Sequence, residues 1–237
     1  MADETLQINR RSMLASGGMA ALGALYFGQS FKGLLAEPGT RAVPPAPVAP
    51  PIAPRASTPA PPPELAYPSV PAALLTKARA ALDTHAARIT RRDRIALVDF
   101  DASSAEPRLH LIDLEAGTAR GLLVAHGSGS DPAHTGFLQR FSNVPGSNAS
   151  SRGAFVTADP YVGKHGRSQR LRGLDPTNDN AFERAIVLHG AWYANADMLR
   201  THGMLGRSQG CFAVGEAKLP EVLSFLGEGR LIYADQA

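Results

Sequence analysis

The sequence predicts a mainly β domain with one helix at its N-terminal end and another near its C-terminus as covers. Two observations support this prediction. From residue 94 onward, short apolar runs recur between turn signals, as strands do in a sheet. Residues 71–89 and 216–226 instead carry apolar side chains at helical spacing, so one helix precedes all the predicted strands and the other follows all but the last.

The predicted elements follow one another closely along the domain. We expect helices at 71–89 and 216–226, a helical turn at 197–201, and strands at 94–100, 108–114, 118–125, 153–157, 169–174, 185–188, 211–214 and 230–234. Pro71 suits the first turn of a helix, where a backbone N–H would have no partner. Residues 126–152 are rich in glycine, serine and asparagine and predict a long loop, which in a compact domain is usually functional or mobile.

Composition divides the chain into three parts. Residues 1–36 carry Arg10-Arg11 before a mildly apolar run, the pattern of a twin-arginine export signal. Residues 37–63 hold 11 of the 19 prolines and almost no large apolar side chain, so we expect an extended linker. Residues 64–237 are long enough for one packed domain. An uncleaved signal that anchors the protein in the inner membrane through residues 10–28 is the alternative to cleavage.

Net charge argues against a nucleic-acid-binding protein. The formal charge is +3, and residues 1–63 contribute +2 of it through five Lys/Arg and three Asp/Glu. The domain is therefore nearly neutral and lacks the uniform basic surface that nucleic acid attracts. One basic cluster remains, formed by Lys164, Arg167, Arg170 and Arg172. It either anchors a substrate or is simply a solvated part of the surface.

Cys211 is the single cysteine of the chain. An exported domain with one cysteine cannot form an internal disulfide, which makes the thiol conspicuous in an oxidising compartment. Ser208-Gln209-Gly210 predicts a small turn directly before it, where backbone N–H groups could stabilise the oxyanion of an acyl transfer and Arg207 could support the turn. We interpret Cys211 as a candidate nucleophile, and an inert buried thiol is the alternative.

His189 is the candidate base for this thiol, which needs a base or a positive potential to ionise at neutral pH. It ends the apolar run 186–188, so we expect its ring to project from the end of a strand, and Gly190 permits the chain to turn there. His202 is a second candidate, nine residues before Cys211. We rank it behind His189 because the sequence predicts no rigid element that would hold it.

The arrangement resembles the signature of L,D-transpeptidase catalytic domains of the YkuD type. That signature runs histidine, about fifteen to twenty residues, Ser/Thr, any residue, glycine and cysteine. Here 17 residues separate His189-Gly190 from Ser208-Gln209-Gly210-Cys211. Further segments within residues 95–235 resemble the murein L,D-transpeptidase branch of the family: Phe141-Ser142-Asn143, Gly153-Ala154-Phe155-Val156-Thr157, Tyr161-Val162-Gly163-Lys164-His165-Gly166, Leu171-Arg172-Gly173-Leu174, Gly206-Arg207-Ser208 and Cys211-Phe212-Ala213-Val214.

The resemblance implies a β-rich catalytic domain over residues 64–237 and assigns roles to individual residues. It implies Cys211 as the nucleophile, His189 as its base, the backbone carbonyl of Gly190 as the acceptor that orients the imidazole, and Ser208 and Gly210 as the residues that shape the nucleophile turn. Gln209 stands where a histidine is common, and no arginine closely follows the cysteine. We therefore expect the substrate to be held by other side chains: Lys164, His165, Arg167, Trp192 and His126.

The resemblance also implies a periplasmic or cell-envelope enzyme that acts on peptidoglycan stem peptides without a cofactor. Its cysteine would attack the carbonyl of the third stem residue, expel D-alanine and pass the acyl group to a neighbouring stem, forming a 3-3 cross-link. Transfer to water would instead make an L,D-carboxypeptidase or a cross-link hydrolase, and a non-catalytic wall-binding module is a third interpretation. A zinc site of His126, His134, His165 and His189 lacks H-E-x-x-H or paired-cysteine spacing, so we expect no metal.

Overall fold

The computed structural model describes residue 67 and residues 69–237. The predicted export signal, membrane anchor and linker therefore lie outside the described residues. Within the part that is described, no helix combines the length and the apolar character that crossing a membrane requires.

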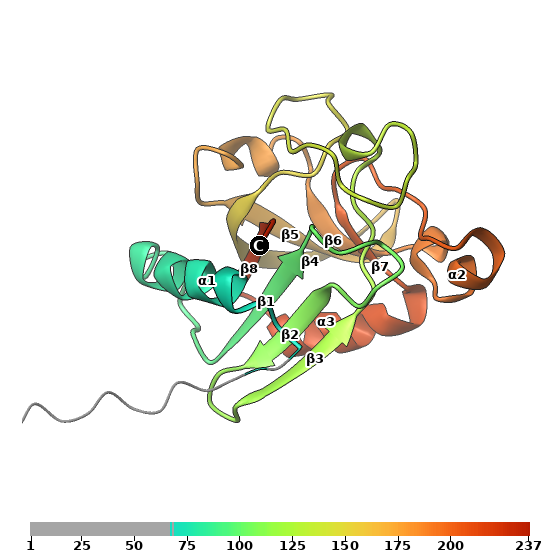
Figure 1. Ribbon diagram of the computed structural model, residues 1–237. Helices are drawn as coiled ribbons and strands as arrows, with labels where there is room; N and C mark the ends of the chain where they lie inside the picture. The colour runs from blue at the N-terminus through green and yellow to red at the C-terminus, as the bar shows by residue number, and fades with distance from the viewer. Residues whose placement is uncertain (1–66, 68) are drawn as a thin grey trace, which may run out of the picture. The chain divides into compact units, whose positions relative to one another are not determined.

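Eight strands form one sheet in the order β3-β2-β1-β8-β4-β5-β6-β7 (Figure 1). Their bounds are β1 Arg94–Asp99, β2 Leu109–Asp113, β3 Thr118–Leu122, β4 Gly153–Gly163, β5 Gly166–Gly173, β6 Val187–Gly190, β7 Phe212–Val214 and β8 Leu231–Asp235. Neighbouring strands are antiparallel except for two parallel pairs, β1 with β8 and β6 with β7. The mainly β prediction is confirmed.

Three α-helices and four single 3-10 turns complete the fold. They are α1 Ala72–Thr84, α2 Asp197–His202, α3 Leu219–Leu226, η1 Ser128–Ser130, η2 Asp179–Ala181, η3 Trp192–Ala194 and η4 Glu216–Lys218. Helix α1 ends at Thr84, five residues before the predicted limit, because the chain leaves helical geometry at His85. The predicted helix 216–226 is divided into η4 and α3 because Pro220 lies at the start of α3, where a proline ring is accommodated.

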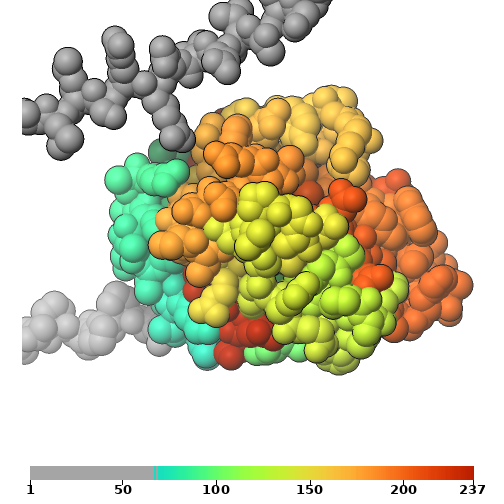
Figure 2. Space-filling view, turned by 90° about the horizontal axis from the view of Figure 1, so that it is seen from above, coloured from blue at the N-terminus to red at the C-terminus, as the bar shows by residue number. Residues whose placement is uncertain are grey.

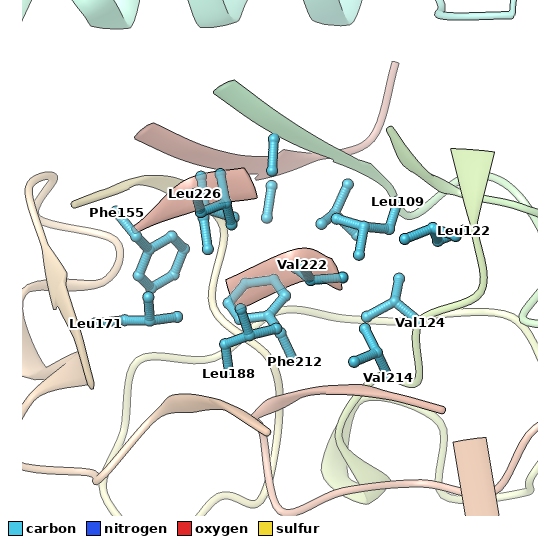
Figure 3. Close-up of a cluster of buried hydrophobic side chains, with 14 of the residues drawn as sticks. Leu109, Leu122, Val124, Phe155, Leu171, Leu188, Phe212, Val214, Val222 and Leu226 are labelled. Atoms are coloured by element: carbon cyan, nitrogen blue, oxygen red, sulfur yellow. The ribbon is translucent and has the colours of Figure 1, made fainter. Parts of the chain in front are cut away.

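Alternating side chains of the central strands fill two separate cores. On one face, Ala96 and Val98 of β1 join a large apolar cluster with Phe155, Phe212 and the buried side of α3 (Figure 3). On the other face, Ile95 and Leu97 of the same strand pack in a second cluster that contains the buried leucines of α1. A strand covered on both faces must be apolar throughout, which explains the continuous run from 95 to 98.

The curl of the sheet brings its two edges together. Beyond β3, Ala125 pairs with Ala213 of β7, and Gly127 pairs with Ser208 just before β7. The loop 126–152 thus begins beside the residues that precede Cys211. Figure 2, seen from above, shows the green-yellow part of this loop packed between later segments of the chain. The loop is consequently part of the surface around the candidate nucleophile.

Candidate active site

The turn that precedes β7 is braced by the side chain of Ser208. Its hydroxyl donates to the carbonyl oxygen of Cys211 at 2.7 Å and accepts from the N–H of Gly210 at 3.1 Å. Gly210 has φ +109°, and a Cβ there would lie 2.7 Å from the carbonyl oxygen of Ala149. Only glycine fits this position without displacing the neighbouring backbone. The N–H of Gly210 donates to Ser208 in this structure and is therefore not free to meet an oxyanion.

Cys211 is partly exposed at the end of this turn. Its thiol donates to the carbonyl oxygen of Ala185 at 3.6 Å. Burial raises the pKa of the thiol above its ordinary value, and it outweighs three effects that lower the pKa, namely a backbone N–H of Val187 and the charges of Lys164 and Arg184. Cys211 therefore rests as a neutral thiol.

His189 lies in β6, beside the strand that follows Cys211. The parallel register pairs His189 with Ala213, two residues beyond the cysteine. The imidazole is 1% exposed, and its Nδ1 is 3.0 Å from the carbonyl oxygen of Gly190, the contact that the resemblance implies. A carbonyl oxygen only accepts, so Nδ1 carries the proton and Nε2 has a free lone pair in the neutral ring. Burial lowers the pKa of His189, which favours this neutral form at neutral pH.

Cys211 and His189 line the same cavity, whose volume is about 650 Å³. Lys164 and His165 reach it from the tip of the β4–β5 hairpin, and Ser208 and Arg207 reach it from the nucleophile turn. The remaining lining comes from the loop 126–152, from β4, from the residues around β6 and from the nucleophile turn: Pro145, Gly146, Asn148, Tyr161, Glu183, Arg184, Ala185, Val187, Tyr193 and Gln209. The cavity thus combines a nucleophile, a base and several cationic side chains.

The ring of His165 stacks on that of His189. Their centroids are 4.3 Å apart and the ring planes differ by 26°. The hydrogen bond to Gly190 and this stack together restrict both the rotation and the tilt of the His189 ring. Burial and the charge of Lys164 lower the pKa of His165, so the stacked pair is uncharged at neutral pH. His165 therefore contacts the candidate base directly.

The predicted basic cluster is divided among different surroundings. Lys164 lines the cavity, whereas Arg167 lines a different groove. The guanidinium of Arg170 lies 4.3 Å from the ring centroid of Tyr161, and that of Arg172 lies 4.4 Å from the centroid of Phe182. Stacking on aromatic rings holds these two arginines along β5. Of the four cations, Lys164 is the one positioned to meet a ligand in the cavity.

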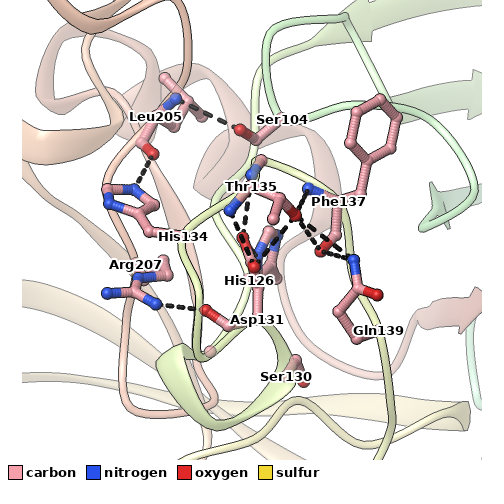
Figure 4. Close-up of polar contacts among 12 residues, drawn as sticks. Ser104, His126, Ser130, Asp131, His134, Thr135, Phe137, Gln139, Leu205 and Arg207 are labelled. Carbon is pink, nitrogen blue, oxygen red and sulfur yellow. Dashed lines mark hydrogen bonds and ion pairs between the residues drawn. The ribbon is translucent and has the colours of Figure 1, made fainter.

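Two other predicted substrate contacts lie outside the cavity lining. The side chain of Trp192 is 66% exposed, and His126 is 1% exposed. His126 belongs to a buried polar group in which Arg108 donates to its Nδ1 at 2.7 Å. The Asp131 carboxylate faces its Nε2 at 3.4 Å, and Figure 4 shows these two side chains together. Burial and the charge of Arg108 lower the pKa of His126 to about 4. His126 is therefore neutral at neutral pH, and it is not part of the cavity lining.

The buried polar group supports the nucleophile turn through backbone contacts. The N–H of Ser208 donates to the carbonyl oxygen of His126 at 2.9 Å, and the N–H of Ser128 donates to that of Ser208 at 2.8 Å. Arg207 donates to the carbonyl oxygens of Asp131 and Pro132, as Figure 4 shows for Asp131. Arg207 therefore acts as a brace between the turn and the loop 126–152.

The four histidines considered for zinc do not form one group. His134 Nε2 is 3.0 Å from the carbonyl oxygen of Leu205, His126 contacts Arg108, and His165 stacks on His189. Among residue 67 and residues 69–237, no three His, Cys, Asp or Glu side chains are arranged to hold a metal ion.

Sequence reasoning missed Arg184 and Tyr193, which both line the cavity. Burial raises the pKa of Tyr193 to about 12, so its hydroxyl keeps its proton at neutral pH. Both residues lie close in sequence to the apolar run 186–188 and His189. That neighbourhood was the available signal, but a cation and an aromatic residue flanking a strand are too common to identify a site.

Several solved structures are similar to this chain over part of its length. One solved structure, an L,D-transpeptidase from Mycobacterium smegmatis, is 12% identical over 60% of this chain and 58% of its own, with a TM-score of 0.38. Another, from Mycobacterium tuberculosis H37Rv, is 10% identical over 61% and 58%, with a TM-score of 0.36. The helical cell shape determining protein Pgp2 from Campylobacter jejuni is 12% identical over 70% and 57%, with a TM-score of 0.40.

These matches span less than two thirds of each solved chain. No curated protein sequence matches this one. The decisive comparison is with a family: the model of the L,D-transpeptidase catalytic domain matches residues 67–234, which is well over half of the chain. The chain belongs to the L,D-transpeptidase catalytic domain family, whose members are acyltransferases that act on peptidoglycan in the cell envelope.

Proposed function

We propose that this chain is a peptidoglycan L,D-transpeptidase that works through a thioester on Cys211. One observation carries the proposal: the only thiol of the chain shares a cavity with a buried histidine, His189, whose Nδ1–H is held by a backbone carbonyl. That hydrogen bond leaves Nε2 as the proton acceptor, as a general base requires. An acidic third member is unnecessary because the carbonyl of Gly190 fixes the tautomer.

The Cys211–His189 pair rests uncharged in this proposal. Burial raises the pKa of the thiol and lowers that of the imidazole, so neither ionic partner is favoured before substrate binds. The proton moves from sulfur to Nε2 as the sulfur attacks, and the imidazolium that forms is stabilised by the Gly190 carbonyl. The positive charges of Lys164 and Arg184 favour the transient thiolate.

Acyl transfer then proceeds in two steps, acylation of Cys211 and transfer of the acyl group to an acceptor amine. The sulfur of Cys211 forms a bond to the carbonyl carbon of the third stem residue, a diaminopimelate, and the amide bond to D-alanine breaks. His189 returns its proton to the departing amine. An amine of a neighbouring stem then attacks the thioester, His189 takes a proton from that amine, and the released sulfur recovers a proton as the 3-3 cross-link forms.

The oxyanion of each step requires donors other than the N–H of Gly210. Tyr193 is our candidate, because it lines the cavity and its pKa of about 12 keeps the hydroxyl protonated. Lys164 is the candidate anchor for a stem carboxylate, since it lies exposed at the hairpin tip and lines the same cavity. The loop residues Pro145, Gly146 and Asn148 also line the cavity and would limit water during the transfer.

Export completes the proposal. Residues 1–36 would direct the protein to the periplasm by a twin-arginine signal, and residues 37–63 would tether the catalytic domain of residues 64–237. If the signal stays uncleaved, residues 10–28 would hold the protein at the inner membrane. The mass of the protein recovered from the envelope distinguishes cleavage from anchoring.

The function is tested by incubating the full chain with disaccharide-tetrapeptide and identifying the products by mass. The proposal expects 3-3 cross-linked dimers with release of D-alanine, and expects neither from the Cys211→Ala variant. Tripeptide without dimers would show that water is the acceptor, which makes the protein an L,D-carboxypeptidase. Dimers that persist in Cys211→Ala would exclude the proposed nucleophile, and absence of all products would favour a non-catalytic wall-binding protein.

A further inference from the structure

We propose that Arg184 is the positioning residue of this active site, joining the loop 142–151 to the nucleophile turn and holding a fixed positive charge beside Cys211. The inference rests on the proposed function, in which Cys211 is the nucleophile. Arg184 lies between η2 and β6, in a segment whose sequence did not single it out. Its role follows from what its two terminal nitrogens contact.

The guanidinium of Arg184 is a fork that holds the loop at four points. Nη1 donates to the carbonyl oxygen of Ser142 at 2.7 Å and to Oγ of Ser151 at 2.6 Å. Nη2 donates to the carbonyl oxygen of Ala149 at 2.6 Å and to Oγ of Ser147 at 3.2 Å. A planar guanidinium makes such paired contacts, whereas a lysine ammonium supplies a point charge without the fork. Arg184 therefore fixes a loop that lines the cavity through Pro145, Gly146 and Asn148.

The same guanidinium lies directly behind the nucleophile turn. A Cβ built at Gly210 would be 3.2 Å from Nη2 of Arg184 and 2.7 Å from the Ala149 carbonyl oxygen that Nη2 binds. The loop, the arginine and the turn thus meet at one point, one residue before Cys211. Displacement of the loop would change the backbone that fixes the direction of the thiol.

Arg184 also precedes the residue that accepts the thiol hydrogen bond. Ala185 has φ +54°, a left-handed conformation in which the Cβ crowds the following carbonyl oxygen. Such conformations persist where the surroundings hold them. The four contacts of Arg184 anchor this segment, so the Ala185 carbonyl remains 3.6 Å from the sulfur of Cys211.

Charge gives Arg184 a second effect on the nucleophile. The charge of Arg184 lowers the pKa of Cys211, in opposition to burial. Lys164 acts in the same direction, but it lies on an exposed hairpin tip, whereas Arg184 is held in place by the loop. The other titratable groups that share the cavity with the thiol are Tyr161, His165, Glu183, His189, Tyr193 and Arg207. A cation near the nucleophile therefore exists although none follows Cys211 closely in sequence.

The experiment separates the charge of Arg184 from its fork. Because Cys211 is the only cysteine, its alkylation by iodoacetamide in the full chain can be followed by intact mass at a series of pH values. Acyl transfer to disaccharide-tetrapeptide is measured on untreated portions of the same protein preparations. The variants are Arg184→Met, which removes charge and fork, Arg184→Lys, which keeps the charge, and Ser151→Ala, which removes one acceptor of the fork.

We expect Arg184→Met to shift the alkylation midpoint to higher pH and to slow alkylation about threefold to tenfold at pH 8. Acyl transfer by this variant should fall by more than alkylation does. Arg184→Lys should retain the wild-type midpoint and still lose roughly tenfold in acyl transfer, since a misplaced loop slows reaction with a large substrate. Ser151→Ala should show the same pattern with a smaller loss.

An unchanged alkylation profile in Arg184→Met would overturn the proposed effect of charge on Cys211. Full acyl transfer by Arg184→Lys would overturn the proposed role of the guanidinium hydrogen bonds in positioning the loop. Circular dichroism identifies a variant that does not fold. If Arg184→Met does not fold, the inference is tested with Arg184→Lys and Ser151→Ala. Equal losses of alkylation and acyl transfer in these two variants would contradict it. A wild-type chain that makes no product would refute the proposed function, while the alkylation profiles would still test Arg184.

Discussion

His126 and His189 are equally buried, at 1% exposure each, yet the structure places them in opposite chemical situations. Arg108 donates to Nδ1 of His126, so that nitrogen is an acceptor and the proton lies on Nε2, facing Asp131. In His189 the proton lies on Nδ1, held by the Gly190 carbonyl, and Nε2 is the acceptor. The two rings are therefore opposite tautomers, although the sequence suggested that both contribute to the site.

The comparison teaches that burial alone does not decide the role of a histidine. Burial and the neighbouring charge of Arg108 lower the pKa of His126 to about 4, which keeps it neutral at neutral pH. His189 meets a backbone carbonyl, which opposes the effect of burial on its pKa. It also opens on the cavity that Cys211 lines, whereas His126 is enclosed by Arg108, Asp131 and the start of the loop 126–152.

The largest expected effect distinguishes the two histidines directly. His189→Gln should reduce acyl transfer by about 10²–10⁴-fold, the usual contribution of a general base, with little change in thermal stability. His126→Asn should instead lower thermal stability more than it lowers acyl transfer. Loss of a buried partner of Arg108 should lower stability by about 2 kcal/mol, or roughly 4–8 °C in melting temperature, with activity reduced far less. Similar activity losses in both folded variants would contradict the comparison.

A smaller effect is expected from His165, the ring stacked on His189. His165→Ala should lower kcat about tenfold by freeing the tilt of the base, while KM for the tetrapeptide changes less. His165→Phe restores a flat ring and should recover most of the activity. If the phenylalanine variant is as slow as the alanine variant, His165 acts through its nitrogens and the stacking account is wrong.

The smallest expected effect is a shift of the pH profile by Lys164. Its positive charge lowers the pKa of both His189 and Cys211. Removing it in Lys164→Met should raise both, so the acid limb of kcat/KM and the midpoint of Cys211 alkylation should both move to higher pH, by a few tenths of a unit at ~0.1 M salt. Lys164→Arg keeps the positive charge and is the control, so it should shift neither the acid limb of kcat/KM nor the midpoint of Cys211 alkylation. At ~1 M salt, where the screening length is about 3 Å, the difference between variant and wild type should disappear.

Most of the fold could be predicted because strands and turns are local patterns. The runs at 94–100, 108–114 and 230–234 match β1, β2 and β8 within one residue at each end. The parallel pairing of β1 with β8 was not predicted, since it joins segments more than 130 residues apart and depends on packing against α1 and α3. The length of the β4–β5 hairpin was missed for a related reason, because its tip is exposed and lacks an apolar pattern.

The candidate site was predictable where one short motif supplies several residues. Cys211, Ser208, Gly210 and His189 follow from spacing, and the structure brings them around one turn and one cavity. Arg108, the partner of His126, lies 18 residues away in sequence, directly before β2. The residues that accept hydrogen bonds from Arg184 are 33 to 42 residues away. Contacts of that kind leave no local signal, so the sequence could neither separate His126 from His189 nor identify Arg184.

The central claim is that Cys211 is acylated with the help of His189, and the most direct test is the mass of the intermediate. The full chain is mixed with disaccharide-tetrapeptide, quenched in acid within the first turnovers and analysed by intact mass and peptide mapping. We predict a covalent adduct on Cys211 equal to the substrate less D-alanine, strongly reduced in His189→Gln and absent from Cys211→Ala. Product formation without this adduct, or an adduct at another residue, would contradict the account.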